Sequence, residues 1–346
     1  MRHNTGSALR ELGVANPVIA APLAGGPTAP ALVIAAWSAQ SLGFLAGGYK
    51  SADALAVQVA EVRRATEIFG VNLFAPNPVP VDAEAFRRYA ARVQEVAGEF
   101  GLDVTRNDPV EDDDAWSDKV ELLLASPVPV VSFTFGVPHA SVVAALRKAG
   151  TMTVQTVTSV DEVAEAEASG VDALTVQSSS AGGHRGTLHP EETADVTPLP
   201  QLIAAIRAQT SLPVIAAGGI STQAGVTGVL EAGAAAAMVG TVLLRSNESG
   251  ASEVHQAAIA EHDRETVVTR AFSGRPARGL RNEFIDRFES AAPLGYPALH
   301  HLTSPLRRAA AAAGNPELVN LWAGTGYRDA TAEPAAAILT RLAGSL

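Results

Sequence analysis

The chain has 346 residues, carries a formal net charge of −11 and contains no cysteine. The negative charge argues against sequence-independent nucleic-acid binding, which needs a basic face. The lack of cysteine excludes disulfides, iron–sulfur clusters and thiol nucleophiles. We see no signal-peptide core and no apolar stretch of membrane-spanning length, so we expect a cytoplasmic protein that binds neither nucleic acid nor membrane.

Short, nearly continuous apolar segments recur along the chain and predict strands buried on both faces. They lie at residues 18–21, 43–46, 71–74, 128–133, 152–157, 173–177, 214–217 and 236–239. Amphipathic segments predict helices at residues 30–40, 52–68, 83–100, 140–149, 160–169, 199–209 and 222–232. This repeat favours an α/β fold, a closed (β/α)₈ TIM barrel, and an open doubly wound sheet is the alternative.

Two segments interrupt the repeat. Residues 103–119 contain the acidic sequence Glu111-Asp112-Asp113-Asp114, which we interpret as a solvated surface excursion. We divide the chain into a ligand-binding barrel at 1–246, a small C-terminal helical cap that contacts substrate at 247–305, and a helical return to the barrel at 306–346. Residues 247–269 are expected to form one or two polar helices, and residues 324–326 a turn.

Two glycine-containing pairs follow the last two predicted strands, Gly218-Gly219 and Gly240-Thr241. Loops at these places in a barrel often bind phosphate, because glycine lets backbone N–H groups approach an anion. The pattern therefore predicts a phosphate site, and a purely structural Gly-Gly turn is the alternative. Neither a Rossmann fingerprint nor a P-loop is present.

His184 lies among glycines in the loop after the sixth predicted strand, and we expect it to be exposed and movable. An imidazole at a barrel strand end can exchange a proton with a substrate. The alternatives are a surface histidine or a metal ligand paired with His189, but a third ligand is missing, so we predict no metal site. His300 and His301 are expected at the surface, and His139 as a capping or surface residue.

Several segments together resemble the nitronate monooxygenases, formerly called 2-nitropropane dioxygenases. They are residues 21–27, 42–49, 69–74, 181–186, 213–220, 238–241 and 321–326. The resemblance covers nearly the whole chain. It is specific for this family because the seven segments occur in the family's order and at its spacing. The Ala-Gly-Gly-His sequence alone is shared with FMN-dependent enoyl-acyl-carrier-protein reductases.

The resemblance implies an oxidoreductase that binds FMN and oxidises alkyl nitronates, such as propionate-3-nitronate, with O₂ to a carbonyl product and nitrite. It implies that His184 is the catalytic imidazole facing the flavin. The residues that it implies in cofactor binding are Pro22, Leu23, Ala24, Asn72, Gln177, Gly182, Gly183, Gly218, Gly219, Met238, Val239, Gly240 and Thr241.

Some substrate-facing positions depart from the family pattern. Thr134 stands where the family commonly has a histidine, residues 178–180 are serines in place of Gly-x-Glu, and Met238 and Thr325 replace glutamines. Two alternatives therefore stay open: an FMN-dependent enoyl reductase or other flavin oxidoreductase of specialised metabolism, and a barrel that binds FMN without turnover. A homodimer is compatible with the sequence, which does not set the oligomeric state.

Overall fold

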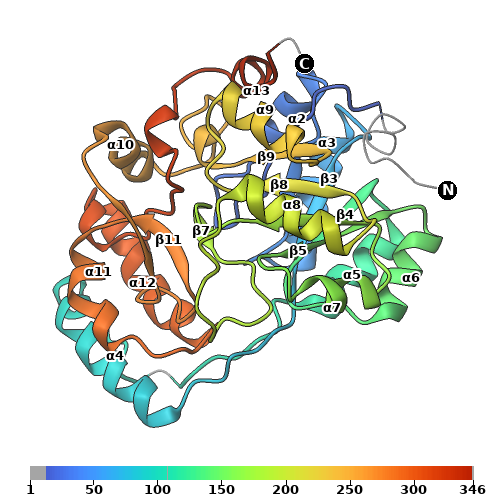
Figure 1. Cartoon of the computed structure of the whole chain (residues 1–346). Helices are drawn as coiled ribbons and strands as arrows, with labels where there is room; N and C mark the ends of the chain where they lie inside the picture. The colour runs from blue at the N-terminus through green and yellow to red at the C-terminus, as the bar shows by residue number, and fades with distance from the viewer. Residues whose placement is uncertain (1–12, 107, 345–346) are drawn as a thin grey trace.

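The computed structural model of the protein describes residues 13–106 and 108–344. Eight parallel strands form one sheet in the order β1-β9-β8-β6-β5-β4-β3-β2. A parallel bridge joins Ala20 to Gly43, and the N–H of Ala20 donates to the carbonyl of Leu42 at 2.9 Å. The two edge strands therefore meet, which confirms the predicted TIM barrel and excludes the open doubly wound sheet. Figure 1 shows the barrel with its helices on one side of the molecule and the cap on the other.

The eight barrel strands lie within two residues of the predicted bounds. They are β1 (Val18–Ala20), β2 (Phe44–Ala46), β3 (Gly70–Ala75), β4 (Val130–Phe135), β5 (Met152–Val157), β6 (Ala173–Gln177), β8 (Val214–Ala217) and β9 (Ala236–Val239). The helices packed around them are α2 (Pro30–Ser38), α3 (Ala52–Arg63), α5 (Trp116–Ala125), α6 (Ala140–Lys148), α7 (Val163–Ala168), α8 (Leu199–Gln209), α9 (Gln223–Glu231) and α13 (Ala335–Ala343).

A cluster of buried apolar side chains from several barrel strands fills the barrel interior, including Ile19, Phe44, Val130 and Ile215. Phe44 is fully buried in this cluster and occupies the space beside Gly70. A β-carbon on Gly70 would lie 2.3 Å from the Phe44 ring, so only glycine fits there. Glycine at position 70 thus leaves room for the Phe44 ring directly beside its partner residue on β3.

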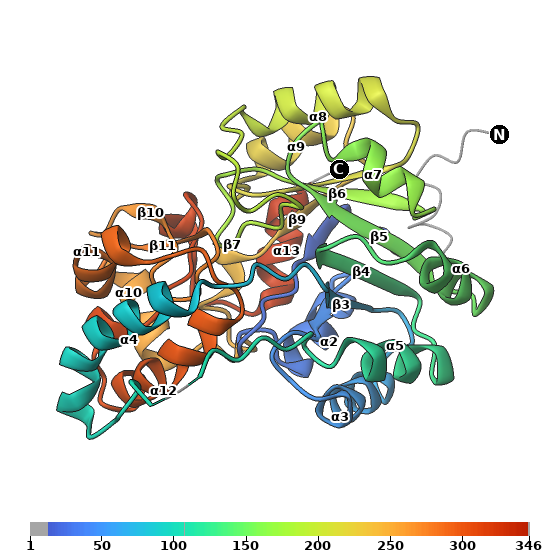
Figure 2. The same cartoon turned by 90° about the horizontal axis from the view of Figure 1, so that it is seen from below.

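The prediction that residues 83–100 supply a barrel helix is wrong. This segment forms α4 (Ala83–Ala97) and the short η1 (Gly98–Phe100), and its buried face packs in a second core with α12 (Ala298–Ala312). The barrel position between α3 and α6 is taken by α5 instead. Figures 1 and 2 show α4 beside the cap helices and away from the barrel. Amphipathic periodicity identified the helix but not the surface that its apolar face covers.

The cap combines helices with a three-stranded antiparallel sheet in the order β10-β11-β7. The strands are β10 (Thr266–Thr269), β11 (Ala277–Leu280) and β7 (Gly183–His184), and the helices are α10 (Glu253–Glu261), α11 (Glu283–Phe288) and α12. The prediction of only helices over residues 247–269 is therefore wrong, because β10 finds its partner in β11, which comes later in the chain. The predicted division of the chain at residues 246 and 305 stays a prediction.

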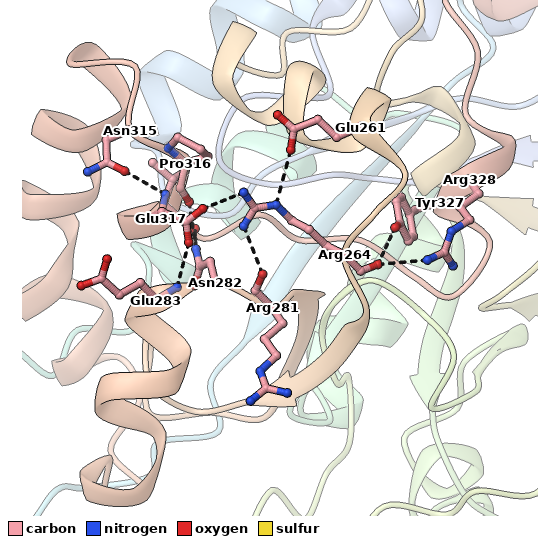
Figure 3. A network of polar contacts seen from close by, with 11 residues as sticks. Glu261, Arg264, Arg281, Asn282, Glu283, Asn315, Pro316, Glu317, Tyr327 and Arg328 are labelled. Atoms are coloured by element: carbon pink, nitrogen blue, oxygen red, sulfur yellow. Dashed lines mark hydrogen bonds and ion pairs between the residues drawn. The ribbon is translucent and has the colours of Figure 1, made fainter.

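The C-terminal segment is fastened to the cap by a polar network around Arg264 (Figure 3). The Arg264 guanidinium donates to Glu317 at 2.6 Å, and the second Glu317 oxygen accepts from the N–H of Glu283 at 3.0 Å. The hydroxyl of Tyr327 donates to the Arg264 carbonyl. The network thus holds both ends of the segment that carries Trp322, and α13 then packs on α2 and β1 as predicted for a return to the barrel.

No helix within residues 13–106 and 108–344 has both the length and the apolar character that a membrane crossing requires.

Replacing Gly70 with Ala should lower the free energy of unfolding by about 1–3 kcal/mol, because the new methyl group overpacks the barrel interior against Phe44. Urea unfolding of the cofactor-free protein measures the change. The matched control is Gly228→Ala in α9, where a β-carbon meets nothing within 4 Å. That substitution should stabilise the protein by about 0.5–1 kcal/mol. Equal effects at the two positions would contradict the packing argument.

Candidate active site

A cavity of about 560 Å³ lies at the C-terminal ends of the barrel strands, between the barrel and the cap. This is the end of the barrel at which active sites occur. All of the residues that the sequence singled out line this one cavity, namely Pro22, Leu23, Ala24, Asn72, Gln177, Gly182, Gly183, His184, Gly218, Gly219, Met238, Val239, Gly240 and Thr241. The fold therefore brings the predicted site together, while the role of each residue stays a prediction.

Glycines form a tightly packed cradle on one side of the cavity. Gly218 and Gly219 have φ angles of 107° and 72°, in the left-handed region, and a β-carbon on either would clash with Ser178 or Ser180. Among the hydrogen bonds of the described residues, none is donated by the backbone N–H of Gly219, Gly240 or Thr241. Free N–H groups on adjacent loops are suited to hold an anion.

His184 is fixed rather than exposed and movable as we expected. Gly183 and His184 pair with Arg278 and Ala277 of β11, so this part of the loop is a strand of the cap sheet. The Gln177 amide adds two bonds, accepting from the N–H of Gly186 at 2.7 Å and donating to the His184 carbonyl at 3.2 Å. The glycines that suggested mobility instead allow the backbone to pass close to the C-terminal segment, since a β-carbon on Gly182 would lie 2.4 Å from the nitrogen of Gly324.

The hydrogen bonds of Ser273 define the tautomer of His184. The Ser273 hydroxyl donates its one proton to the Arg275 carbonyl at 3.2 Å, and its oxygen lies 2.8 Å from Nε2 of His184. With the hydroxyl proton directed to the Arg275 carbonyl, we expect Nε2 to carry a hydrogen and donate it, with Nδ1 as the unprotonated acceptor.

Aromatic rings enclose the His184 imidazole, with centroids of Phe135, Tyr296 and Trp322 at 5.8, 5.7 and 5.4 Å. This burial, together with the positive charges of Arg275 and Arg307, lowers the pKa of His184 from 6.5 to about 3. The imidazole is therefore neutral at physiological pH.

Two buried arginines were missed by the sequence analysis. Arg275 is fully buried with its guanidinium 4.2 Å from the Phe135 ring centre, and its Nη1 has no partner among the described residues. Arg307 lines the cavity and donates to Asn320 and to the His300 carbonyl, at 3.0 and 2.9 Å. Neither guanidinium forms an ion pair with a carboxylate in the described part of the chain. Because a buried cation without a counter-ion is costly, this side of the cavity is suited to an anion.

Comparisons with known proteins agree with the site. The sequence profile of a family described as "Nitronate monooxygenase" matches residues 7–343. A probable nitronate monooxygenase of Staphylococcus aureus (strain MRSA252) is 35% identical over 340 residues, which cover 96% of this chain and 94% of that protein. This chain belongs to the nitronate monooxygenase family. It is accordingly an oxidoreductase.

Solved structures place the chain in the same group. The nitroalkane oxidase of Streptomyces ansochromogenes superposes with a TM-score of 0.91 at 42% identity, covering 97% of both chains. FabK of Thermotoga maritima superposes with a TM-score of 0.74 at 25% identity, covering 97% of this chain and 94% of that one. The barrel and cap together are therefore shared with both enzymes.

This nitronate monooxygenase family member has no imidazole at position 134. Thr134 lines the cavity, accepts from Nδ2 of Asn72 at 3.0 Å and lies 3.4 Å from the hydroxyl of Thr156. Thr175 lines the same wall, and its buried hydroxyl oxygen has no partner among the described residues. This wall of the cavity thus presents threonine hydroxyl groups, and at position 134 one of them stands in place of the histidine that is common in the family.

A second imidazole reaches the cavity from the cap. The expectation that His300 lies at the surface is wrong: its ring lines the cavity and stacks on Tyr49, with centroids 4.1 Å apart and planes at 3°. The spacing of His300 and Arg307 was the available signal, because residues seven apart share one face of a helix. His301 is partly exposed and pairs with Asp112 at 2.8 Å, and His139 caps α6 as expected.

Tyr49 is held in place by the acidic segment that we expected to be only a solvated excursion. Its backbone N–H donates to Asp114 at 2.8 Å, and the other Asp114 oxygen pairs at 2.7 Å with Lys119, whose side chain is 1% exposed. Tyr49 and Asp114 both have positive φ angles, 63° and 57°. Non-glycine residues in this region persist only where their surroundings hold them, which the buried pair does here.

No group of three or more histidine, aspartate or glutamate side chains in residues 13–106 and 108–344 is placed to hold a metal ion.

The tautomer of His184 can be observed by NMR of protein labelled with ¹⁵N-histidine. Because its pKa is about 3, the ring should stay in the neutral form with hydrogen on Nε2 as the pH falls through 6.5. In the unfolded chain the same histidine takes up a proton near pH 6.5. Because the folded protein does not, His184 lowers the free energy of unfolding as the pH falls from 6.5 towards 3. Ser273→Ala should release the Nδ1–H tautomer, and Ser273→Thr should restore the native signal. A titration near 6.5 in the native protein would contradict this account.

The Asp114–Lys119 pair should behave as one unit in unfolding experiments. Asp114→Asn or Lys119→Met alone should cost about 3 kcal/mol, because each leaves a buried partner unpaired. The double variant should cost clearly less than the sum, which urea unfolding measures. The exposed Arg88–Glu84 pair is the control, where Glu84→Gln should change stability by less than about 1 kcal/mol. Additive effects at Asp114 and Lys119 would refute the coupling.

Proposed function

We propose that the protein is an FMN-dependent enzyme that oxidises alkyl nitronates, propionate-3-nitronate among them, with O₂ to a carbonyl product and nitrite. The observation that carries the proposal is the absence of a carboxylate partner, within the described residues, for the buried Arg275 and Arg307 beside His184. A nitronate is an anion with two oxygens and supplies the charge that this side of the cavity lacks.

The cavity fits FMN through its glycine cradle and its unpaired polar groups. Gly218, Gly219, Gly240 and Thr241 would surround the phosphate, because their loops leave backbone N–H groups free and the tight packing requires glycine. The residues from 22 to 24 would lie along the flavin ring, with Asn72 and Gln177 at its polar edge. When bound, FMN supplies the redox chemistry by taking electrons from the substrate and passing them to O₂.

Arg307 contacts the cavity directly and would hold the nitronate oxygens, while Arg275 acts through its charge from behind Phe135. His184 presents the unprotonated Nδ1 towards the reacting carbon and limits the orientation of the substrate. Trp322 and Tyr296 exclude water around this ring, which strengthens the attraction between the cations and an anionic substrate.

The neutral state of His184 favours a preformed nitronate over its parent nitroalkane. Removing the α-proton of a neutral nitroalkane requires a base, and Nδ1 is the available acceptor. A pKa lowered by roughly three units makes proton uptake about a thousandfold less favourable. A nitronate needs no such step. The site should therefore bind and oxidise the anion directly.

Oxygen-uptake assays test the proposal. The purified protein should be yellow or take up added FMN, and it should consume O₂ with propionate-3-nitronate and alkyl nitronates in the absence of NADH. We expect kcat/KM for a nitronate to exceed that for its nitroalkane by about a hundredfold or more, from the depressed pKa of His184. His184→Ala should retain the flavin spectrum and lose most turnover. A flavin-loaded enzyme that leaves nitronates untouched would exclude this function.

The likeness to FabK motivates one alternative, an FMN-dependent enoyl reductase. That activity requires a nicotinamide nucleotide as reductant. Anaerobic addition of NADH or NADPH separates the two functions: rapid bleaching of the flavin would favour the reductase, and bleaching by a nitronate alone favours the oxidase.

A further inference from the structure

A second cavity of about 820 Å³ adjoins the first on the side of the cap helix α12. Tyr49, Phe74, Phe135, His300, Ser304 and Arg308 line both spaces, which we call the inner and the outer cavity. The stacked rings of Tyr49 and His300 therefore stand between the two. Only one aromatic ring separates His184 from the outer cavity, because Phe135 and Tyr296 both contact the imidazole and line that cavity.

The outer cavity has an apolar wall, and charged side chains make up part of the remaining lining. The apolar wall consists of the shared rings together with Pro76, Pro78, Tyr296, Pro297 and Pro305, and the other lining residues include Lys50, Arg308 and the acidic residues 111–114. Prolines and aromatic rings offer apolar surface at little cost in side-chain entropy. Such a surface is suited to an organic chain rather than to a phosphate or a metal ion.

Three of the four acidic residues that line the outer cavity are occupied by contacts within the protein, and the carboxylate of Asp113 has no hydrogen-bond or ion-pair partner among the described residues. Glu111 accepts from the N–H of Val81 at 3.0 Å, Asp112 pairs with His301, and Asp114 pairs with Lys119. These contacts fasten the acidic segment to the loop before α4, to α12 and to α5. The single carboxylate of Asp113 is too few for a cation site, which requires several oxygen ligands.

We propose that the outer cavity binds the apolar tail of the nitronate whose charged end lies at His184. The inference rests on the proposed function and extends it to the substrate class. FMN would fill much of the inner cavity. The alkyl chain of the nitronate, attached to the reacting carbon, would extend past the stacked Tyr49 and His300 rings into the outer cavity. Longer alkyl and aryl-alkyl nitronates are therefore better substrates than short ones.

The series from ethyl through butyl to hexyl nitronate tests this subsite in oxygen-uptake assays. We expect kcat/KM to rise about threefold to fourfold with each methylene group, the factor that corresponds to burial of one methylene. Pro78→Trp fills the outer cavity from a position that does not line the inner one. In this variant the ratio of hexyl to ethyl nitronate should fall towards one. Val57→Trp places the same ring at a 67% exposed position of α3 and should keep the native ratio.

Alkanoates of the same chain lengths provide a second readout, because a carboxylate has the planar two-oxygen shape of a nitronate and is not oxidised. Their dissociation constants, from perturbation of the flavin spectrum, should fall with chain length in the native enzyme and not in Pro78→Trp. If all nitronates are oxidised but kcat/KM does not rise with chain length, the proposed subsite is rejected and the proposed function stands. The same holds if Pro78→Trp leaves the dependence of kcat/KM on chain length unchanged. Absence of any nitronate turnover rejects the proposed function, and the alkanoate series then decides the subsite.

Discussion

The antiparallel pairing of Gly183 and His184 with β11 joins the barrel to the cap at the point where the proposed chemistry takes place. A loop at the end of a barrel strand is ordinarily free to move, but here two of its residues are strand residues of another sheet. Ser273 and Arg275 precede β11 and contact the same loop, through Nε2 of His184 and the carbonyls of Arg185 and Thr187. The position, the tautomer and the electrostatic environment of the imidazole all follow from this one junction.

The same junction explains why the cap must be built from distant parts of the chain. The segment ending at Trp322 bridges to Gly279 of β11, and the Arg264 network holds both ends of that segment. Helix α4 leaves the barrel to cover the cap core, and α5 replaces it on the barrel. The cavity is therefore enclosed by elements from early, middle and late sequence. Its cationic side comes from the cap and its glycine cradle from the barrel.

In this nitronate monooxygenase family member the barrel and the cap would have different tasks: the barrel loops would bind the cofactor phosphate, and the cap would contact the substrate. The barrel loops that carry Gly218 and Gly240 follow general rules of phosphate binding in this fold. The cap supplies Arg307 and His300 on one face of α12, and the acidic segment positions Tyr49 against them. The serines after Gln177 are part of the cradle, because the side chains of Ser178 and Ser180 pack against Gly218 and Gly219.

The sequence by itself determined the barrel and the barrel-loop residues that line its cavity, but not the lining residues of the cap. Continuous apolar strands and the rule that strand ends carry the site are local or periodic signals, and they located His184, Gly218 and Gly240 without coordinates. Only the tertiary structure decided that His184 is held in place and neutral, that Arg275 and Arg307 are buried and form no ion pair with a carboxylate of the described residues, and that α4 belongs to the cap core. Burial, charge compensation and strand pairing depend on contacts between residues far apart in the chain, such as His184 with Ser273, 89 positions apart, and Tyr49 with Tyr296, 247 positions apart. No local pattern encodes such contacts, because a strand or an apolar helix face shows that it needs a partner but not which one.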